Sequence, residues 1–273
     1  MSLRSCFALS ALALLFGAIG YGLFGVEGAT GALAIGCIGL AADLRSSSYV
    51  LERLGAREIT DSNFIWWARD LADRAGVSCP RFFEVYDDRP NAATAGLTQT
   101  SCSIILFGDI RRRLTRDELA AVIGHELGHI AARDIQVRAL CGFMVWATIS
   151  SAVALTVLAA LARRGGAVFV VGIAVVTGIV ALSLRVVLSH GQEYDADRVG
   201  AEIAGPRNMI SALQKLETAA TRRSSVVEKH PRLVVATVVD ARSRPWRFST
   251  HPPLHKRIAR LQRADRTMQR AAV

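Results

Sequence analysis

Four long apolar runs dominate the pattern of hydrophobic and polar positions along this chain of 273 residues. Few charged residues interrupt these runs, which lie at about residues 6–25, 27–42, 139–162 and 165–187. A helix needs about 20 apolar residues to cross the ~30 Å hydrocarbon core of a bilayer. Since a buried core helix is rarely apolar on all sides over that length, the pattern predicts four transmembrane helices.

The four runs form two predicted hairpins that divide the chain into four parts. These are a first hairpin at 1–44, a first soluble part at 45–138, a second hairpin at 139–188, and a second soluble part with a basic tail at 189–273. Basic residues gather in both soluble parts, so the positive-inside rule places these parts in the cytosol. Arg163 and Arg164 lie between the last two runs and oppose this rule. Either the bias elsewhere outweighs them, or the second hairpin does not cross fully.

The soluble parts show the shorter periodicities of a compact α+β fold. A helix is predicted over 63–76, capped by Asp61 or Ser62, and two strands over 81–86 and 102–107 with a turn at 87–96 between them. Further along, helices are predicted at about 192–203 and 206–222. The expected fold class is therefore a mainly α membrane protein with a cytosolic α+β domain that contains a small sheet.

The segment His125-Glu126-Leu127-Gly128-His129 lies in a stretch of helical spacing that a capping box, Thr115 with Glu118, begins. Four residues advance a helix by about 6 Å, so both imidazoles lie on one face and can bind one zinc ion. Glu126 can then reach a water molecule at that ion. Small residues around the motif predict close packing against other backbone. The alternative is two exposed helix histidines beside a solvated Glu.

Catalytic zinc usually takes a third protein ligand, and the best candidate follows the fourth apolar run. Glu193 and Asp197 lie four residues apart; Glu193 can ligate the ion while Asp197 accepts a hydrogen bond from a ligating imidazole. The alternatives are a solvated acidic helix start, or His190 as the ligand. Far downstream, His251 lies in a Pro-flanked bend, where it can donate a hydrogen bond to an oxyanion or be a surface residue of a basic tail.

The blocks H-E-x-x-H, E-x-x-x-D and H-P-P-x-x-x-R-I, in this order, resemble those of the HtpX-like membrane zinc metallopeptidases, which are relatives of the CAAX prenyl proteases. The segment Asn91–Gly96 resembles the Asn-Ala-x-x-x-Gly segment ahead of the catalytic helix in that family. The resemblance implies a zincin-like (gluzincin) domain with one Zn²⁺ per chain. The residues that it assigns are His125, His129 and Glu193 as ligands, Glu126 as catalytic base, Asp197 as the acid behind a ligand, and His251 as a contact of the reaction intermediate.

An edge strand beside the catalytic helix commonly aligns a substrate backbone in zinc peptidases. Residues 101–107 are the candidate here, with an ordinary sheet strand as the equal alternative. The expected substrate contacts are Asn91, Ala92, Ser103 and Ile104. The segment 218–250 matches no feature of the family, and 219–225 is a candidate region for autocleavage.

The function that the resemblance implies is a membrane-bound, zinc-dependent endopeptidase of the bacterial inner membrane, cleaving membrane proteins in quality control or stress response. The alternatives are a catalytically silent scaffold or sensor, and a CAAX-type protease that processes prenylated proteins. Expected partners are polypeptide substrates and the lipid bilayer; no oligomeric state is predicted.

Charge and cysteine usage agree with this location. The net charge is +10, and no stacking aromatics alternate with the basic residues of the tail. An anionic lipid surface is therefore the expected partner rather than nucleic acid. Five scattered cysteines without a C-x-x-C spacing favour a reducing compartment.

Overall fold

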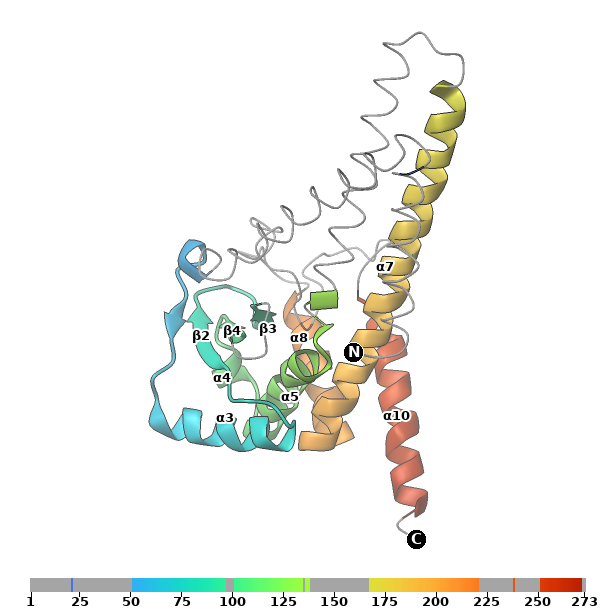
Figure 1. Ribbon diagram of the computed structural model, residues 1–273. Coiled ribbons are helices and arrows are strands. Elements are labelled where there is room, and N and C mark those ends of the chain that lie inside the picture. The colour runs from blue at the N-terminus through green and yellow to red at the C-terminus, as the bar shows by residue number, and fades with distance from the viewer. Residues whose placement is uncertain are drawn as a thin grey trace. The chain divides into compact units, whose positions relative to one another are not determined.

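The computed structural model describes Tyr21 and residues 51–96, 101–134, 136–137, 167–220, 238 and 251–271. The chain divides into two compact units, one of Met1–Leu44 with Gln136–Ser189 and the other of Arg45–Ile135 with His190–Val273. The second unit contains the sheet and all the motifs, and we call it the sheet unit (Figure 1).

Helix α7 (Ala167–Ala204) is the longest described element, with 38 residues. It covers most of the fourth apolar run and continues through Glu193 and Asp197. The prediction of a separate helix that begins near residue 192 is therefore wrong, because no helix-breaking residue pair separates the apolar run from the acidic motif. The runs at 6–25, 27–42 and 139–162 lie outside the described residues. Among the residues that are described, no helix combines the length and the apolar character needed to cross a bilayer.

A four-stranded mixed sheet forms one layer of the sheet unit, with strand order β1-β2-β4-β3. Its strands are β1 (Arg57–Glu58), β2 (Arg81–Val85), β3 (Asn91–Ala95) and β4 (Ser103–Phe107). Strands β2 and β4 pair in parallel, whereas β1 pairs with β2 and β3 pairs with β4 antiparallel. In the last pair, Asn91 lies opposite Phe107 and Ala95 opposite Ser103.

One sequence prediction about this sheet is wrong, and one choice that the sequence left open is decided. Residues 91–95, expected within a turn, form strand β3, because pairing with β4 overrides the weak strand propensity of Asn and Ala. Of the two alternatives for residues 101–107, the structure has the ordinary sheet strand: β4 lies between β2 and β3, and it cannot pair with a further strand. The edge strand next to β4 in the described sheet is therefore β3.

The two faces of the sheet are covered differently. On one face, Ile104 and Leu106 of β4 pack with helices α3 (Ser62–Arg74) and α5 (Arg116–Ala132) in the main core. On the other face, Ile105 and Phe107 pack with Leu54. Successive residues of a strand point to opposite faces, so the all-buried strand β4 serves both cores. This arrangement brings α5, which carries the histidines, directly under the sheet (Figure 1).

Local signals set the starts of α3 and α5 as the sequence predicts. The Asp61 side chain accepts a hydrogen bond from Asn63 N at 3.1 Å and so caps α3. The capping box of Thr115 and Glu118 begins α5, and Arg133, with φ 58°, ends it. The remaining described helices of the sheet unit are α4 (Ile110–Arg113), α8 (Pro206–Ala220) and α10 (Leu254–Ala271).

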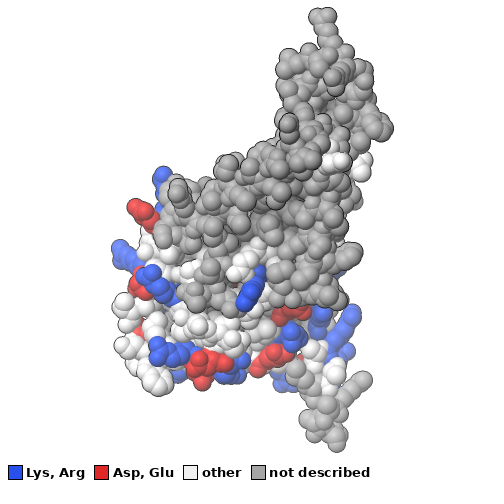
Figure 2. Space-filling model, viewed as in Figure 1, with Lys and Arg blue, Asp and Glu red and all other residues white. Residues whose placement is uncertain are grey.

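Charged side chains of both signs are interspersed on the visible described surface of the sheet unit (Figure 2). Two ion pairs of the sheet unit join separate elements: Arg81 with Glu58 at 2.6 Å, and Arg111 with Glu84 at 2.8 Å. Exposed pairs of this kind contribute little to stability, typically below about 1 kcal/mol each. The stability of the unit therefore rests on its two cores and on the buried polar groups.

Glu118 is one such buried group, and it makes the stability of the sheet unit depend on pH. Its side chain accepts hydrogen bonds from Ser211 Oγ at 2.6 Å and Lys215 Nζ at 2.7 Å, which tie α5 to α8. Burial alone would raise the pKa of Glu118, but the bonds from Lys215, Ser211 and the Thr115 backbone outweigh it and lower the pKa from 4.5 to about 2.

A carboxyl whose pKa falls on folding stabilises the fold above its unfolded pKa. We therefore expect this stabilisation, about 1–3 kcal/mol, to be complete above about pH 5 and to disappear as the pH falls toward 2. Thermal unfolding of the wild type and Glu118→Gln across this range is the measurement. The difference in melting temperature between them should shrink toward acid; a constant difference would contradict the assignment.

Candidate metal centre

The histidine motif lies in the most buried part of α5. His125, Glu126 and His129 have exposed fractions of 0%, 1% and 2%, which excludes the alternative of two solvated histidines. From α7, Glu193 (0%) and Asp197 (2%) are equally buried. An unpaired charge is very costly in such surroundings, so these groups must neutralise one another or a bound ion.

Helices α5 and α7 approach each other closely because glycines lie where they cross. A Cβ at Gly200 would lie 2.6 Å from the Ala121 carbonyl oxygen, and one at Gly128 would lie 3.1 Å from Ala196 Cα. The small residues around the motif therefore have the role that the sequence predicts. They let the backbone of α7 come near enough for Glu193 to reach the two imidazoles.

Replacement of Gly200 by Ala should force the two helices apart. We expect a loss of about 1–3 kcal/mol in unfolding free energy together with weaker zinc binding. Gly191 lies in the same helix with no described atom within 4 Å of its added Cβ. Gly191→Ala should therefore stabilise the helix by up to about 1 kcal/mol. Thermal unfolding and zinc titration of both variants test this; equal effects would show that the close approach is unimportant.

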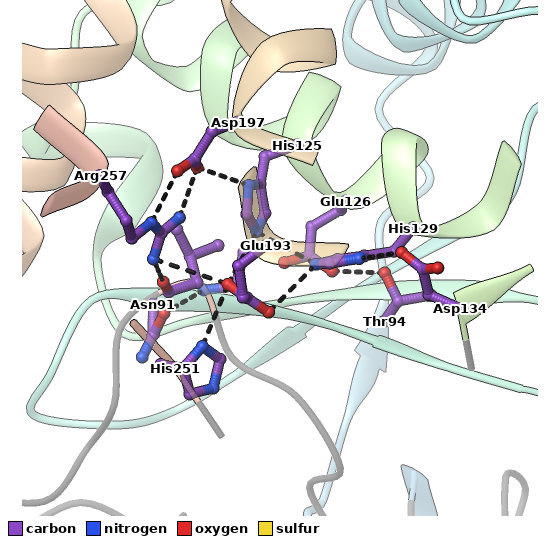
Figure 3. Close-up of polar contacts among 12 residues, drawn as sticks. Asn91, Thr94, His125, Glu126, His129, Asp134, Glu193, Asp197, His251 and Arg257 are labelled. Atoms are coloured by element: carbon purple, nitrogen blue, oxygen red, sulfur yellow. Dashed lines mark hydrogen bonds and ion pairs between the residues drawn. The ribbon is translucent and has the colours of Figure 1, made fainter. Parts of the chain in front are cut away.

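Three potential ligand atoms converge in the centre of the site (Figure 3). His125 Nε2 and His129 Nε2 are 3.2 Å apart. Glu193 Oε2 lies 3.7 Å from the first, and Oε1 lies 3.5 Å from the second. A tetrahedral zinc ion with bonds of about 2.0–2.1 Å separates its ligand atoms by about 3.3 Å. The three side chains thus already have the spacing that a single zinc ion requires.

Carboxylates fix the orientation of both imidazoles. His125 Nδ1 lies 3.0 Å from Asp197 Oδ1, and His129 Nδ1 lies 2.9 Å from Asp134 Oδ2. Each Nδ1–H donates to its carboxylate, which leaves each Nε2 with a lone pair directed at the other ring and at Glu193. Converging lone pairs and a carboxylate repel one another unless a cation lies between them. This donor set fits a zinc ion and its usual carboxylate–histidine support.

Arg257 lies within the third motif, but the sequence did not predict a role for it. Its guanidinium donates to both oxygens of Asp197 at 2.5 and 2.7 Å and lies 3.6 Å from Glu193 Oε2. Burial alone would raise the pKa of Asp197, but Arg257 and the bond from His125 hold it below its usual value. The bidentate pair keeps Asp197 ionised behind His125.

His251 also reaches the site, from the residues just ahead of α10. Its Nδ1 lies 3.0 Å from Glu193 Oε2, so the alternative of a solvated tail residue is wrong. Burial would raise the pKa of Glu193, but His251, His129 and Arg257 lower it well below its usual value. Glu193 is therefore an anionic oxygen donor, as a zinc ligand must be.

Strand β3 carries two of the predicted substrate contacts, Asn91 and Ala92. The Thr94 hydroxyl donates a hydrogen bond to Glu126 Oε2, a contact that the sequence alone did not reveal. Asn91 Oδ1 accepts a hydrogen bond from Ala92 N at 2.9 Å, and both residues belong to the edge strand. Ser103 and Ile104, also expected to contact substrate, are buried in the interior strand β4.

Comparison with known proteins agrees with this geometry. Residues 64–265 match Peptidase family M48. The chain is 30% identical to a protease HtpX homolog of Polynucleobacter necessarius over 79% of each chain, and 28% identical to one of Paraburkholderia phytofirmans over 97% of each chain. The crystal structure of S. mikatae Ste24p superposes with a TM-score of 0.57 at 18% identity, covering 94% of this chain and 62% of that protein.

The chain therefore belongs to peptidase family M48. The resemblance to HtpX-like proteases drawn from the motifs is confirmed, and so is the assignment as a metallopeptidase, with which the His125, His129 and Glu193 cluster is compatible. The likeness to Ste24p concerns the fold, and the chain spans about three fifths of the length of that protein.

Proposed function

We propose that this chain is a zinc-dependent endopeptidase in which His125, His129 and Glu193 hold one zinc ion. The observation that carries the proposal is the convergence of their ligand atoms, all within 4.8 Å of one another, at fully buried positions. Structural zinc sites usually have four protein ligands, whereas catalytic sites keep one position open. Three ligands beside a buried Glu are typical of the catalytic kind.

The mechanism assigns the chemistry to a few side chains. A zinc ion, when bound, supplies a Lewis acid that acidifies water and polarises a carbonyl group. Glu126 accepts a proton from the attacking water and delivers it to the departing amine. Thr94 holds the Glu126 carboxylate in one orientation through its hydrogen bond. Asp197 and Asp134 hold the two imidazoles with Nε2 directed inward.

The polar groups on the α10 side of the site provide hydrogen-bond donors where an oxyanion develops. Arg257 lies 3.6 Å from Glu193, and His251 lies in contact with the same carboxylate. Preorganised donors of this kind stabilise the negative charge of a tetrahedral intermediate. His251 is the residue that we assign to this contact, and Arg257 holds Asp197 and so supports His125.

The substrate is an extended polypeptide that adds to the outer edge of β3. Edge strands bind peptides through backbone hydrogen bonds, while side-chain pockets give specificity. Asn91 and Ala92 lie on this edge, and Thr94 connects it to Glu126. The position of β4 in the middle of the sheet removes Ser103 and Ile104 from backbone pairing with a substrate.

The apolar runs support a location in the bacterial inner membrane, with four spans and the sheet unit in the cytosol. The organisation that we propose, from a first hairpin at 1–44 to the basic tail, follows these runs, and a protease HtpX homolog matches 97% of this chain. Membrane proteins are then the accessible substrates, and cleavage of damaged ones in stress is the proposed task.

A metal-dependent cleavage assay tests this function. Full-length protein in detergent should hydrolyse casein with zinc, stop when 1,10-phenanthroline is added, and recover when zinc is restored. Stoichiometric zinc binding without hydrolysis of casein or a membrane protein would instead favour the catalytically silent scaffold.

A further inference from the structure

Val238 is the one described residue between α8 and the third motif, and it contacts the outer edge of β3. Its backbone N–H donates to the Ala92 carbonyl oxygen at 3.0 Å. Ala92 is paired in register with Leu106 of β4 on its inner side. Val238 therefore bonds to the side of β3 that faces away from β4. This is the edge to which the proposed substrate adds.

The carbonyl group of Val238 reaches the other side of the candidate site. It accepts a hydrogen bond from Arg257 Nη1 at 2.5 Å, and the same nitrogen lies 3.6 Å from Glu193 Oε2. A single residue thus bridges the edge strand and a guanidinium that contacts a proposed zinc ligand. A substrate residue bound along β3 would meet these same two partners.

The side chain of Val238 anchors it in this position. It is completely buried, at 0% exposure, and belongs to the main core with Ala92. Its sequence neighbours form the run Leu233-Val234-Val235-Ala236-Thr237-Val238-Val239. This run lies in the segment 218–250, which matches no motif of the family.

We propose that Val238 acts as an internal pseudosubstrate that occupies the β3 edge and lowers the activity of the resting enzyme. The proposal rests on the proposed function, and it adds how that same site is regulated. A polypeptide substrate must displace Val238 to pair with Ala92. The pocket that holds the Val238 side chain then accepts a small aliphatic side chain of the substrate.

Two variants weaken this occupancy in different ways. Val238→Pro removes the N–H that Ala92 accepts, and Val238→Ala keeps that donor but trims the buried anchor. Apparent affinity for a substrate scales with the fraction of molecules in which the β3 edge is free of Val238. We therefore expect kcat/KM for a casein-derived peptide to rise about tenfold in Val238→Pro and about threefold in Val238→Ala. Leu216→Ala is the control. It removes a buried core side chain of α8, which is 1% exposed, and so destabilises the fold without touching the β3 edge; it should not raise activity.

Binding in the Glu126→Gln background tests the proposal without turnover. The probe is a fluorescently labelled peptide of residues 231–242 of this chain, titrated into full-length, zinc-loaded protein. The added Val238→Pro or Val238→Ala change should tighten binding, by about tenfold for the first. Unchanged or weaker binding in both folded variants would overturn the pseudosubstrate. Failure of the proposed function would appear separately, as absence of metal-dependent hydrolysis in the wild type and in every Val238 variant.

Discussion

Glu126→Gln is expected to abolish peptide hydrolysis, lowering kcat by at least about 10³-fold, because general-base catalysis at this position has no substitute. The amide cannot accept the proton, yet it fills the same space at 1% exposure and can still bond with Thr94. Zinc content should remain one ion per chain, since Glu126 is not among the three converging ligands. Casein cleavage and metal analysis on the same preparation measure both effects.

A matched control for this variant lies on α7. Glu202→Gln changes the same functional group at an exposed position, where the carboxylate pairs with Arg198, and activity should be unchanged. Turnover by Glu126→Gln that matches the wild type would remove Glu126 from the mechanism. Loss of zinc from Glu126→Gln would instead assign it a structural or ligating role.

Arg257→Leu is expected to be the most destabilising of the substitutions considered, at about 3–5 kcal/mol, because it leaves the buried Asp197 without its charge partner. Both guanidinium bonds to Asp197 and the bond to Val238 O are lost together. Zinc affinity should also fall, since Asp197 orients His125. Arg257→Lys keeps the charge but not the bidentate geometry, and it should recover only part of the stability.

Arg260 gives the comparison for this second prediction. It lies one turn further along α10, where its exposed guanidinium stacks over the Tyr194 ring at 4.7 Å. Arg260→Leu should cost about 1 kcal/mol or less. Thermal unfolding of both variants, with and without zinc, separates the two positions. A loss at Arg257 no larger than that at Arg260 would show that the buried pair does not support the site.

Features with local causes could be predicted from the sequence. The capping box fixes the start of α5 and hence which face carries His125 and His129. The spacing of Glu193 and Asp197 on a helix predicts that both side chains reach one site, and the structure brings them there. The glycines and alanines around the motif predict close packing. The structure has such packing where Gly200 of α7 lies against the backbone of Ala121.

Features that depend on partners distant in sequence were missed. Asn91–Ala95 has only a weak strand propensity of its own, and its pairing with β4 makes it a strand. Arg257 belongs to the third motif, but its role depends on Asp197, which lies 60 residues away in the sequence. Asp134 lies five residues beyond His129, just past the end of α5, and its carboxylate contacts the His129 ring. An acid at this position is a sequence signal for a carboxylate that orients the second imidazole.

Zinc stoichiometry in full-length protein tests the central claim most directly. The wild type should retain one zinc ion per chain after dialysis against a moderate chelator, whereas His129→Ala and Glu193→Ala should retain none while the Glu202→Ala control behaves as the wild type. X-ray absorption at the zinc edge should then show two imidazole nitrogens and a carboxylate oxygen. A Glu193→Ala protein that keeps its zinc with unchanged affinity would contradict the joint site formed by α5 and α7.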